Sequence, residues 1–496
     1  MEEIILKQKI GIFVGPGLFF LVLIFITPQG MNQESRAILA STLWIATWWI
    51  SEAVPIPVTS LLPIVLFPLT KGLDIGKTTA AYGHPIIFLF IGGFILALAI
   101  ERWELHRRIA LNIIKAMGTD GSKIILGFMI ASALLSMWIS NTAASLMMMP
   151  IGLAIISHFT ENLKSKNKGF RPFDFPFGKA LMLSIAYSAS IGGMATIIGT
   201  PTNLVFSAVV KQIYNYEITF SKWMLFGFPV SILILGICWF YLVRIAFPMK
   251  DSGIAGGLEE IDEQLKQLGK MTSAEKRVLG VFCLTAFAWI TRSFLWVKFI
   301  PGINDTVIAI GGATLLFLIP SKSEEEKNLM NWETAVKLPW GIILLFGGGL
   351  SIASGFKASG LAEWIGNQMG IFQHIPFILI LGVLVISVNF LTEITSNTAT
   401  ASIILPILAG FALAINVHPF SLMIGATVAA SCAFMLPVAT PPNAVIFGSG
   451  YVTMGDMVRT GVWMNLLSTI ILTLIVYFLL PLIWGLDLHV FPMNFR

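Results

Sequence analysis

Apolar segments of the length that crosses a lipid bilayer recur along almost the whole of this sequence. A transmembrane helix needs roughly 17 to 25 predominantly apolar residues. Hydrophobic side chains make up 56% of the 496 residues and charged ones only 11%, which is more apolar surface than a water-soluble fold can bury. We therefore predict an all-α polytopic membrane protein with about eleven transmembrane helices. We place these helices at residues 11–27, 37–54, 56–70, 84–100, 180–211, 226–248, 278–298, 304–320, 340–356, 421–447 and 462–484.

Two further apolar stretches, residues 123–158 and 376–415, are interrupted at their centres by polar residues. The interruption is Ser140-Asn141-Thr142 in the first stretch and Ser396-Asn397-Thr398 in the second. We expect each following arm to end near a proline, at Pro150 or Pro406, and neither arm to be long enough for a separate crossing. The sequence therefore predicts two re-entrant hairpins with Ser-Asn-Thr at their tips, the first entering from the cytoplasm and the second from outside.

The two hairpins belong to an internal repeat. One constant shift carries residues 140–143 onto 396–399 and keeps its register for about sixty residues without an insertion. Residues 199–203 and 439–443, each containing a Thr-Pro dipeptide that should break a helix, match at a slightly smaller shift. Four predicted crossings separate the first copy from the second. We therefore predict two inverted-topology repeats, an arrangement typical of secondary transporters with their substrate site at the repeat interface.

Basic residues crowd three of the predicted loops, which the positive-inside rule places in the cytoplasm. We place the N-terminus, with Lys7 and Lys9, on the same side, in what we expect to be the inner (cell) membrane of a bacterium. The expected organisation is an N-terminal segment 1–35, a first repeat 36–248, a solvated cytoplasmic linker 249–277 and a second repeat 278–496. Because the basic residues form no continuous face, we expect no nucleic-acid partner. The loop residues are Lys164, Lys166, Lys168, Arg171 and Lys179; Lys250, Lys266, Lys270, Lys276 and Arg277; and Lys322, Lys327 and Lys337.

The hairpin tips carry groups that suit a small anion together with small cations. Serine and threonine hydroxyls and the asparagine amide can donate to a carboxylate, while amide and backbone carbonyl oxygens can ligate a hard cation. Residues 124–157, 180–210 and 380–415 contain no lysine or arginine. An anion bound there would need another source of positive charge, because an unpaired charge at low dielectric is costly. Co-bound sodium ions would supply that charge and would couple uptake to the sodium gradient.

In these motifs the chain resembles the divalent anion:sodium symporters, which carry dicarboxylates, citrate or sulfate. The resemblance covers nearly the whole length and includes residues 49–59, both Ser-Asn-Thr motifs, 199–201 and 439–441. It implies sodium-coupled uptake of a C4 dicarboxylate such as succinate, fumarate or malate by an elevator-type alternating-access mechanism. It also implies a homodimer in which each subunit has a scaffold domain and a moving transport domain.

The resemblance further implies which residues bind. The first sodium site would consist of Ser136, Ser140, Asn141 and Gly199, and the second of Thr392, Thr395, Asn397 and Ala439. Thr395 departs from the family pattern, in which a smaller residue is expected. The dicarboxylate would contact Asn141, Thr142, Thr200, Pro201, Ser396, Asn397, Thr398, Thr440 and Pro441.

Several alternatives stay open at this point. A single Ser-Asn-Thr could simply hold helices together, but its duplication in register favours a binding role. We expect Glu393 and Glu52 to be hydrogen-bonded structural carboxylates. A sodium-independent dicarboxylate exchanger, or a citrate or sulfate symporter of the same fold, is the alternative within transport. A channel or an intramembrane enzyme is the other rival, and we predict no enzyme because no histidine lies within either hairpin core to activate a nucleophile.

Overall fold

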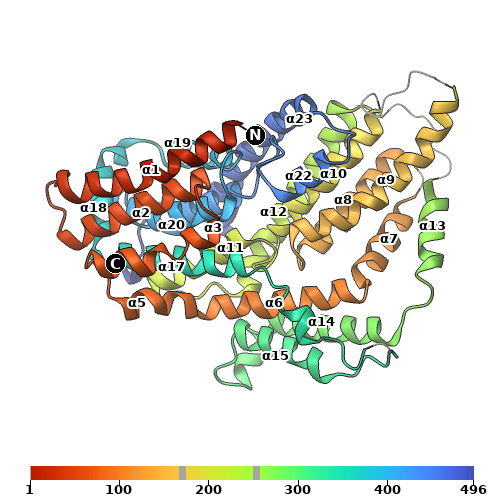
Figure 1. Cartoon of the computed structure of the whole chain (residues 1–496), viewed down its shortest axis with the longest axis horizontal. Coiled ribbons are helices and arrows are strands. Elements are labelled where there is room, and N and C mark those ends of the chain that lie inside the picture. Colours follow the sequence, from red (N-terminus) through yellow and green to blue (C-terminus); the bar gives the residue numbers. More distant parts are fainter. Residues whose placement is uncertain (1, 119, 167–174, 250–256, 325, 496) are drawn as a thin grey trace.

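The computed structural model describes residues 2–118, 120–166, 175–249, 257–324 and 326–495, and Figure 1 shows their arrangement. In these ranges every regular element is a helix, and the single β-bridge, between Pro320 and Asn328, stands alone. The prediction of an all-α protein is confirmed. The first half contains α1 (Glu2–Phe25), α2 (Gln33–Ser51), α3 (Ile56–Thr59), α4 (Leu62–Leu69), α5 (Ile75–Ala80), α6 (Pro85–Arg102), α7 (Leu105–Met117), α8 (Gly121–Ser136), α9 (Asn141–Lys166), α10 (Pro176–Gly193), α11 (Pro201–Tyr214) and α12 (Phe220–Tyr241).

The second half repeats much of this order. It contains α13 (Gly257–Gln267), α14 (Ser273–Thr291), α15 (Asp305–Leu318), α16 (Trp332–Ala335), α17 (Trp340–Ser359), α18 (Leu361–Gln368), α19 (Phe377–Leu391), α20 (Asn397–Ala414), α21 (Pro419–Ala429), α22 (Pro441–Phe447), α23 (Met454–Leu474) and α24 (Leu480–Trp484). Helix starts keep the two shifts of the sequence repeat. The helices α18, α19 and α20 begin at the repeat equivalents of the first residues of α7, α8 and α9, and α22 begins at the equivalent of the first residue of α11.

Seven helices in the described ranges are long and apolar enough to cross a membrane. They are Leu6–Phe25, Ile75–Arg102, Asn141–Thr160, Phe220–Ala246, Trp340–Ser359, Asn397–Ala414 and Met454–Trp484. The predicted span at 56–70 is instead two short helices, α3 and α4. Pro63 lies in the first turn of α4 and has no N–H to donate to the carbonyl of residue 59, which removes one helical hydrogen bond where α3 gives way to α4.

The predicted spans at 180–211 and 421–447 are each interrupted. Residues 194–200 separate α10 from α11, and residues 430–440 separate α21 from α22. The residue before each second helix, Thr200 or Thr440, is extended, with φ −139° and ψ 143° or φ −141° and ψ 149°. A following proline disfavours the helical region for the residue before it, so the Thr-Pro dipeptides end the two breaks as predicted. We call residues 194–200 the first break and residues 430–440 the second break.

The arms of the two predicted hairpins differ in length. The first arms, α8 and α19, have 16 and 15 residues, about 24 and 22 Å at the α-helical rise, which is short of a hydrocarbon core of roughly 30 Å. The second arms were expected to be equally short, and that expectation is wrong. Both α9 and α20 continue through the prolines at which we expected them to end, Pro150 and Pro406, and both are long enough to cross.

The helices that lead into the breaks form the centre of the molecule. Every residue of α21 is buried, and so is every residue of α10 from Ala180 onward. By contrast, α1 exposes large apolar side chains such as Phe13 and Phe25. The broken helices are therefore enclosed by other helices, which is where irregular backbone is tolerated within a membrane.

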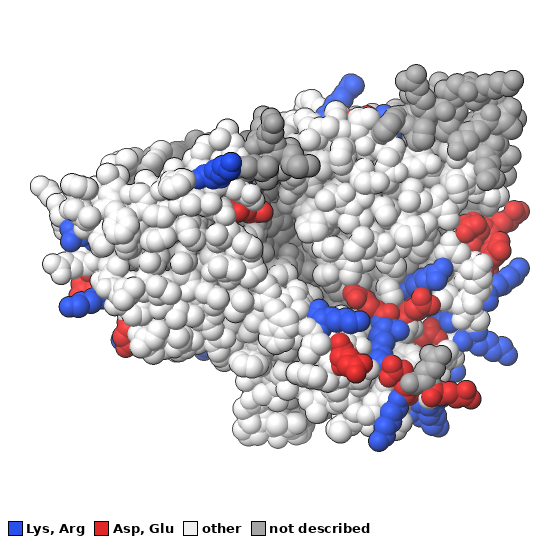
Figure 2. Space-filling model, viewed as in Figure 1, with Lys and Arg blue, Asp and Glu red and all other residues white. Residues whose placement is uncertain are grey.

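The linker expected to be solvated is a docked helix in its described part, because it has an apolar face. Ile261 of α13 is fully buried, and α13 packs on α7. Two ion pairs hold the linker there, Lys115 to Asp262 at 2.5 Å and Arg108 to Glu275 at 2.7 Å. Charged side chains gather at this end of the molecule, whereas most of the remaining visible face is uncharged (Figure 2). Of the predicted cytoplasmic basic residues, Lys164, Lys166, Lys168, Arg171 and Lys250 lie outside the described side chains.

Candidate functional site

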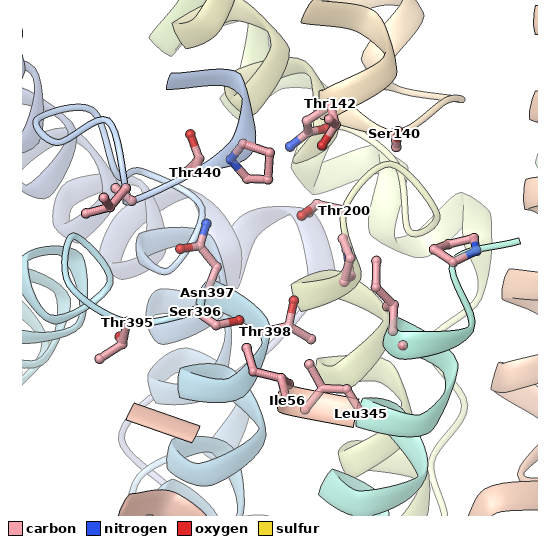
Figure 3. A pocket seen from close by; sticks show the side chains of 18 of the residues that line it. Ile56, Ser140, Thr142, Thr200, Leu345, Thr395, Ser396, Asn397, Thr398 and Thr440 are labelled. Carbon is pink, nitrogen blue, oxygen red and sulfur yellow. The ribbon is translucent and has the colours of Figure 1, made fainter. Parts of the chain in front are cut away.

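A cavity of about 740 Å³ lies where both Ser-Asn-Thr tips and both Thr-Pro breaks meet. Figure 3 shows Ser140 and Thr142 facing Ser396, Asn397 and Thr398 across it, with Thr200 and Thr440 between them. Ser136 and Thr392, the two remaining predicted ligands, do not line the cavity and are fully buried. Segments from opposite halves of the sequence thus share one chamber. The predicted residues that line it are Ser140, Asn141, Thr142, Gly199, Thr200, Pro201, Thr395, Ser396, Asn397, Thr398, Ala439, Thr440 and Pro441.

The cavity is surrounded by helix N-termini. The hydroxyl of Ser140 accepts a hydrogen bond from the Ala143 N–H at 3.1 Å at the start of α9. Ser396 is the N-cap of α20, and α11 and α22 begin at the prolines that follow Thr200 and Thr440. The N–H groups of a first helical turn lack partners within the helix and carry partial positive charge. The site therefore favours an anion although neither tip carries a basic side chain.

Oxygen atoms converge at the first tip. The Asn141 Oδ1 accepts a hydrogen bond from the Ser136 hydroxyl at 2.5 Å. A Cβ placed on Gly193 would lie 2.6 Å from the Asn141 Oδ1 and 3.1 Å from the Gly199 carbonyl oxygen, so both oxygens face one small space that only glycine leaves open. Amide and carbonyl oxygens are the ligands that hard cations such as sodium take. Gly193 does not line the cavity itself but lies against the first tip, and its only sequence signal is the Gly192-Gly193 pair next to the break.

The second tip is arranged differently. The Oδ1 of Asn397 is buried and accepts no hydrogen bond in the described part of the chain. The Thr395 hydroxyl is 2.8 Å from the Leu391 carbonyl oxygen and 2.7 Å from the Thr400 hydroxyl, and the Thr392 hydroxyl donates to the Asn389 carbonyl at 2.9 Å. An unpartnered buried acceptor is costly, and a cation would satisfy it. Among the described residues no group of three or more His, Cys, Asp or Glu side chains is placed to hold a metal.

Glu393 joins the second tip to the second break. Its carboxylate accepts hydrogen bonds from the N–H groups of Phe434, Met435 and Leu436 at 2.7 to 2.9 Å, and from the Asn465 amide at 2.7 Å. The side chain is buried, and all of these partners are donors. The expectation of a hydrogen-bonded structural carboxylate is confirmed for Glu393.

The same expectation is wrong for Glu52. This residue is the C-cap of α2 in the left-handed region with φ 50°, is exposed, and lines the cavity. It makes no hydrogen bond with the described residues. Lys7 of α1, whose charge is opposite to that of Glu52, also lines the cavity. Its Nζ donates to the Ile394 carbonyl at 3.4 Å, beside the second tip. Nothing local in the sequence places either residue there, because both come from helices outside the repeat motifs.

Apolar side chains form a wall of the chamber beside the second tip. Ile56 and Leu345 form its visible part in Figure 3, and Pro57, Phe94 and Ile342 also contribute. None of these residues was predicted from the sequence to belong to the site. A chamber lined by both hydrogen-bonding groups and apolar side chains suits a small anion that has a short carbon chain.

Comparison with known proteins relates the whole chain to one family. Residues 10–485 match the sodium:sulfate symporter transmembrane region. The chain is 48% identical over 485 residues to the sodium-dependent dicarboxylate transporter SdcS of Staphylococcus saprophyticus, covering 97% of this chain and 93% of that protein. It is also 48% identical over 487 residues to SdcS of Staphylococcus aureus, with the same coverage of both chains.

Two solved structures share the fold at low sequence identity. The efflux pump MtrF of Neisseria gonorrhoeae superposes with a TM-score of 0.58 at 12% identity, covering 94% of this chain and 98% of MtrF. The YdaH transporter of Alcanivorax borkumensis superposes with a TM-score of 0.59 at 12% identity, covering 92% and 99%. At this identity the likeness concerns the fold alone.

Proposed function

This chain belongs to the sodium:sulfate symporter family, and from that membership we propose that it imports C4 dicarboxylates such as succinate, fumarate or malate together with sodium ions. The observation that carries the proposal is the single cavity lined by both Ser-Asn-Thr tips. Its support in sequence is the 48% identity to sodium-dependent dicarboxylate transporters over nearly the full length. The chemistry is transport of an unchanged substrate, not catalysis.

Each tip has two tasks in this proposal. The amides and hydroxyls of Asn141, Thr142, Ser396, Asn397 and Thr398 hold the two carboxylates, assisted by the helix N-termini that begin at the cavity. Thr200, Pro201, Thr440 and Pro441 complete the contact surface. The sodium ligands are Ser136, Ser140, Asn141 and Gly199 at the first tip and Thr392, Thr395, Asn397 and Ala439 at the second.

The sodium ions have two roles: they offset the negative charge of the bound substrate, and their gradient drives its uptake. A dicarboxylate brings two negative charges into a chamber whose tips and breaks carry no basic side chain, and an uncompensated charge at low dielectric is costly. Sodium bound behind each tip offsets that cost. Substrate binding therefore requires sodium, and the sodium gradient drives uptake.

Alternating access then proceeds by an elevator-type movement. The two tips and two breaks move together as a transport domain past the apolar wall of Ile56, Phe94 and Leu345, which offers the anion no hydrogen bond. Two inverted repeats, residues 36–248 and 278–496, supply equivalent halves of the transport domain. The assembly is a homodimer in the bacterial cell membrane with its N-terminus in the cytoplasm.

Uptake into proteoliposomes tests the proposal. We expect saturable accumulation of labelled succinate under an inward sodium gradient and none when choline replaces sodium. Equal rates in sodium and choline would instead identify an exchanger, and a substrate panel in which citrate or sulfate outcompetes succinate would reassign the anion. Non-saturable flux would point to a channel, and a chemically altered product to an enzyme.

A further inference from the structure

Two buried asparagines brace the breaks in the same way in both halves of the chain. Asn203 of α11 and Asn443 of α22 are fully buried and occupy equivalent positions of the repeat. Neither lines the cavity. Their amide groups therefore serve the protein itself and do not contact the substrate.

The Asn203 amide Nδ2 donates across the first break. It lies 2.7 Å from the Thr196 carbonyl oxygen, 3.3 Å from that of Gly193 and 3.4 Å from that of Met194. The interruption of the helix leaves these carbonyls without their usual helical donors. One side chain thus ties the end of α10 and the interior of the break to the start of α11.

The Asn443 amide repeats this contact in the second break. Its Nδ2 donates to the Ala433 carbonyl at 3.2 Å and to the Leu436 carbonyl at 3.0 Å. Ala433 and Leu436 are the repeat equivalents of Gly193 and Thr196. The Oδ1 atoms of Asn203 and Asn443 accept no hydrogen bond in the described part of the chain, so the donor end of each amide makes the contacts.

The backbone that Asn203 holds lies next to the oxygens that could ligate a cation. At the first break the Gly193 and Gly199 backbones approach so closely that a Cβ on Gly199 would lie 2.5 Å from the Gly193 carbonyl oxygen. The Gly199 carbonyl shares its small space with the Asn141 Oδ1. Loss of the brace would let the carbonyl turn away, and a metal site needs its ligands held to within about 0.5 Å.

We propose that Asn203 and Asn443 are positioning residues for sodium, each setting the backbone oxygen of its own break, Gly199 or Ala439. This inference rests on the proposed sodium coupling and deepens it. Because the braces act on the ion ligands and not on the anion, their loss weakens sodium binding much more than substrate binding.

The test compares Asn203→Leu and Asn443→Leu, which keep the side-chain size and remove the donor, with Gln264→Leu. Gln264 is a buried amide of the linker helix α13 that donates to Glu260 of the same helix at 2.8 Å and does not line the cavity. In proteoliposomes we expect the sodium concentration for half-maximal uptake to rise about tenfold in the two break variants, as for loss of a well-placed hydrogen bond, and to change less than about twofold in the control. The KM for succinate at saturating sodium should stay within about twofold of wild type.

A second readout does not need transport. Sodium raises the melting temperature of a protein that binds it only when folded, by an amount that grows with the ratio of the sodium concentration to the dissociation constant. The sodium concentration that gives a chosen rise should therefore increase by the same factor in the purified variants. Should a leucine variant fail to fold, Asn203→Ala and Asn443→Ala remove the amide donor without adding an apolar branch next to the carbonyls, and the same shift is expected. If the variants fold and keep the sodium dependence of a sodium-dependent wild type, the inference is overturned but the proposed function is not. A wild type without sodium dependence overturns the proposed function and the inference with it.

Discussion

The two tip asparagines occupy equivalent places in sequence but have different partners. The Asn141 oxygen already accepts the Ser136 hydroxyl, whereas the buried Asn397 oxygen has no partner among the described residues. Both amides face the same cavity. In the proposed site each asparagine contacts both the ion and the anion, so we expect that neither half of the site works without the other.

We therefore expect Asn141→Ala and Asn397→Ala each to lower sodium-driven succinate uptake by about 100-fold or more, as for loss of hydrogen bonds to a charged group. Asn112→Ala, on the exposed surface of α7, is the matched control and should transport normally. Size-exclusion profiles check that all three variants fold alike. Wild-type uptake by either tip variant would remove that asparagine from the site.

Lys7 is the one basic side chain among the described residues that line the cavity, and Glu52 is the one acidic side chain there. Lys7 lines the cavity beside the second tip, where it attracts a dianion from solution by a long-range force that salt screens within about 10 Å at 0.1 M. We expect Lys7→Gln to raise the KM for succinate about threefold at low ionic strength, and this difference to vanish when choline chloride is added at constant sodium. Lys9→Gln removes a charge that does not line the cavity and should have no effect. A KM increase that persists at high salt would contradict steering.

At the scale of elements, the two breaks differ in how their backbone is satisfied. The second break is longer, and Glu393 accepts three of its N–H groups. The repeat equivalent of Glu393 is Met137, whose backbone carbonyl accepts the Thr196 hydroxyl at 2.5 Å. The second break therefore depends on one carboxylate from the end of α19 as well as on its asparagine brace.

Replacement of Glu393 should consequently destabilise the fold. Glu393→Gln leaves one acceptor oxygen and places an amide donor against the backbone N–H groups, each of which costs about 1 to 3 kcal/mol when buried without a partner. We expect a melting temperature well below that of wild type in detergent. Glu363→Gln on the exposed surface of α18 should melt like wild type. An unchanged melting temperature for Glu393→Gln would show that the carboxylate does not hold the break.

Local sequence signals account for part of these elements. The Thr-Pro dipeptides indicated where α11 and α22 begin, because proline acts on the residue directly before it. No such signal marks where α10 ends after Gly193, because that end is stabilised by Asn203 from the next helix. The predicted lengths of α9 and α20 were too short, because proline inside a membrane helix is tolerated when neighbouring groups satisfy the freed carbonyl.

At the scale of the whole molecule, the repeat made it possible to predict which residues meet. Thirteen of the fifteen predicted binding residues line one chamber, and the other two, Ser136 and Thr392, are buried outside its lining. The apolar wall and the two charged residues of the lining, Lys7 and Glu52, could not be predicted. They come from α1, α2, α3, α6 and α17, whose positions beside the tips depend on packing between distant segments.

We propose that one dicarboxylate bridges the two tips with sodium bound behind them, and a cryo-electron microscopy structure in sodium and succinate would show whether it does. We expect density for the anion between residues 140–142 and residues 396–398, within hydrogen-bonding distance of both asparagine amides, and ion density beside the Gly199 and Ala439 carbonyls. Succinate density elsewhere, or on one tip alone, would contradict it.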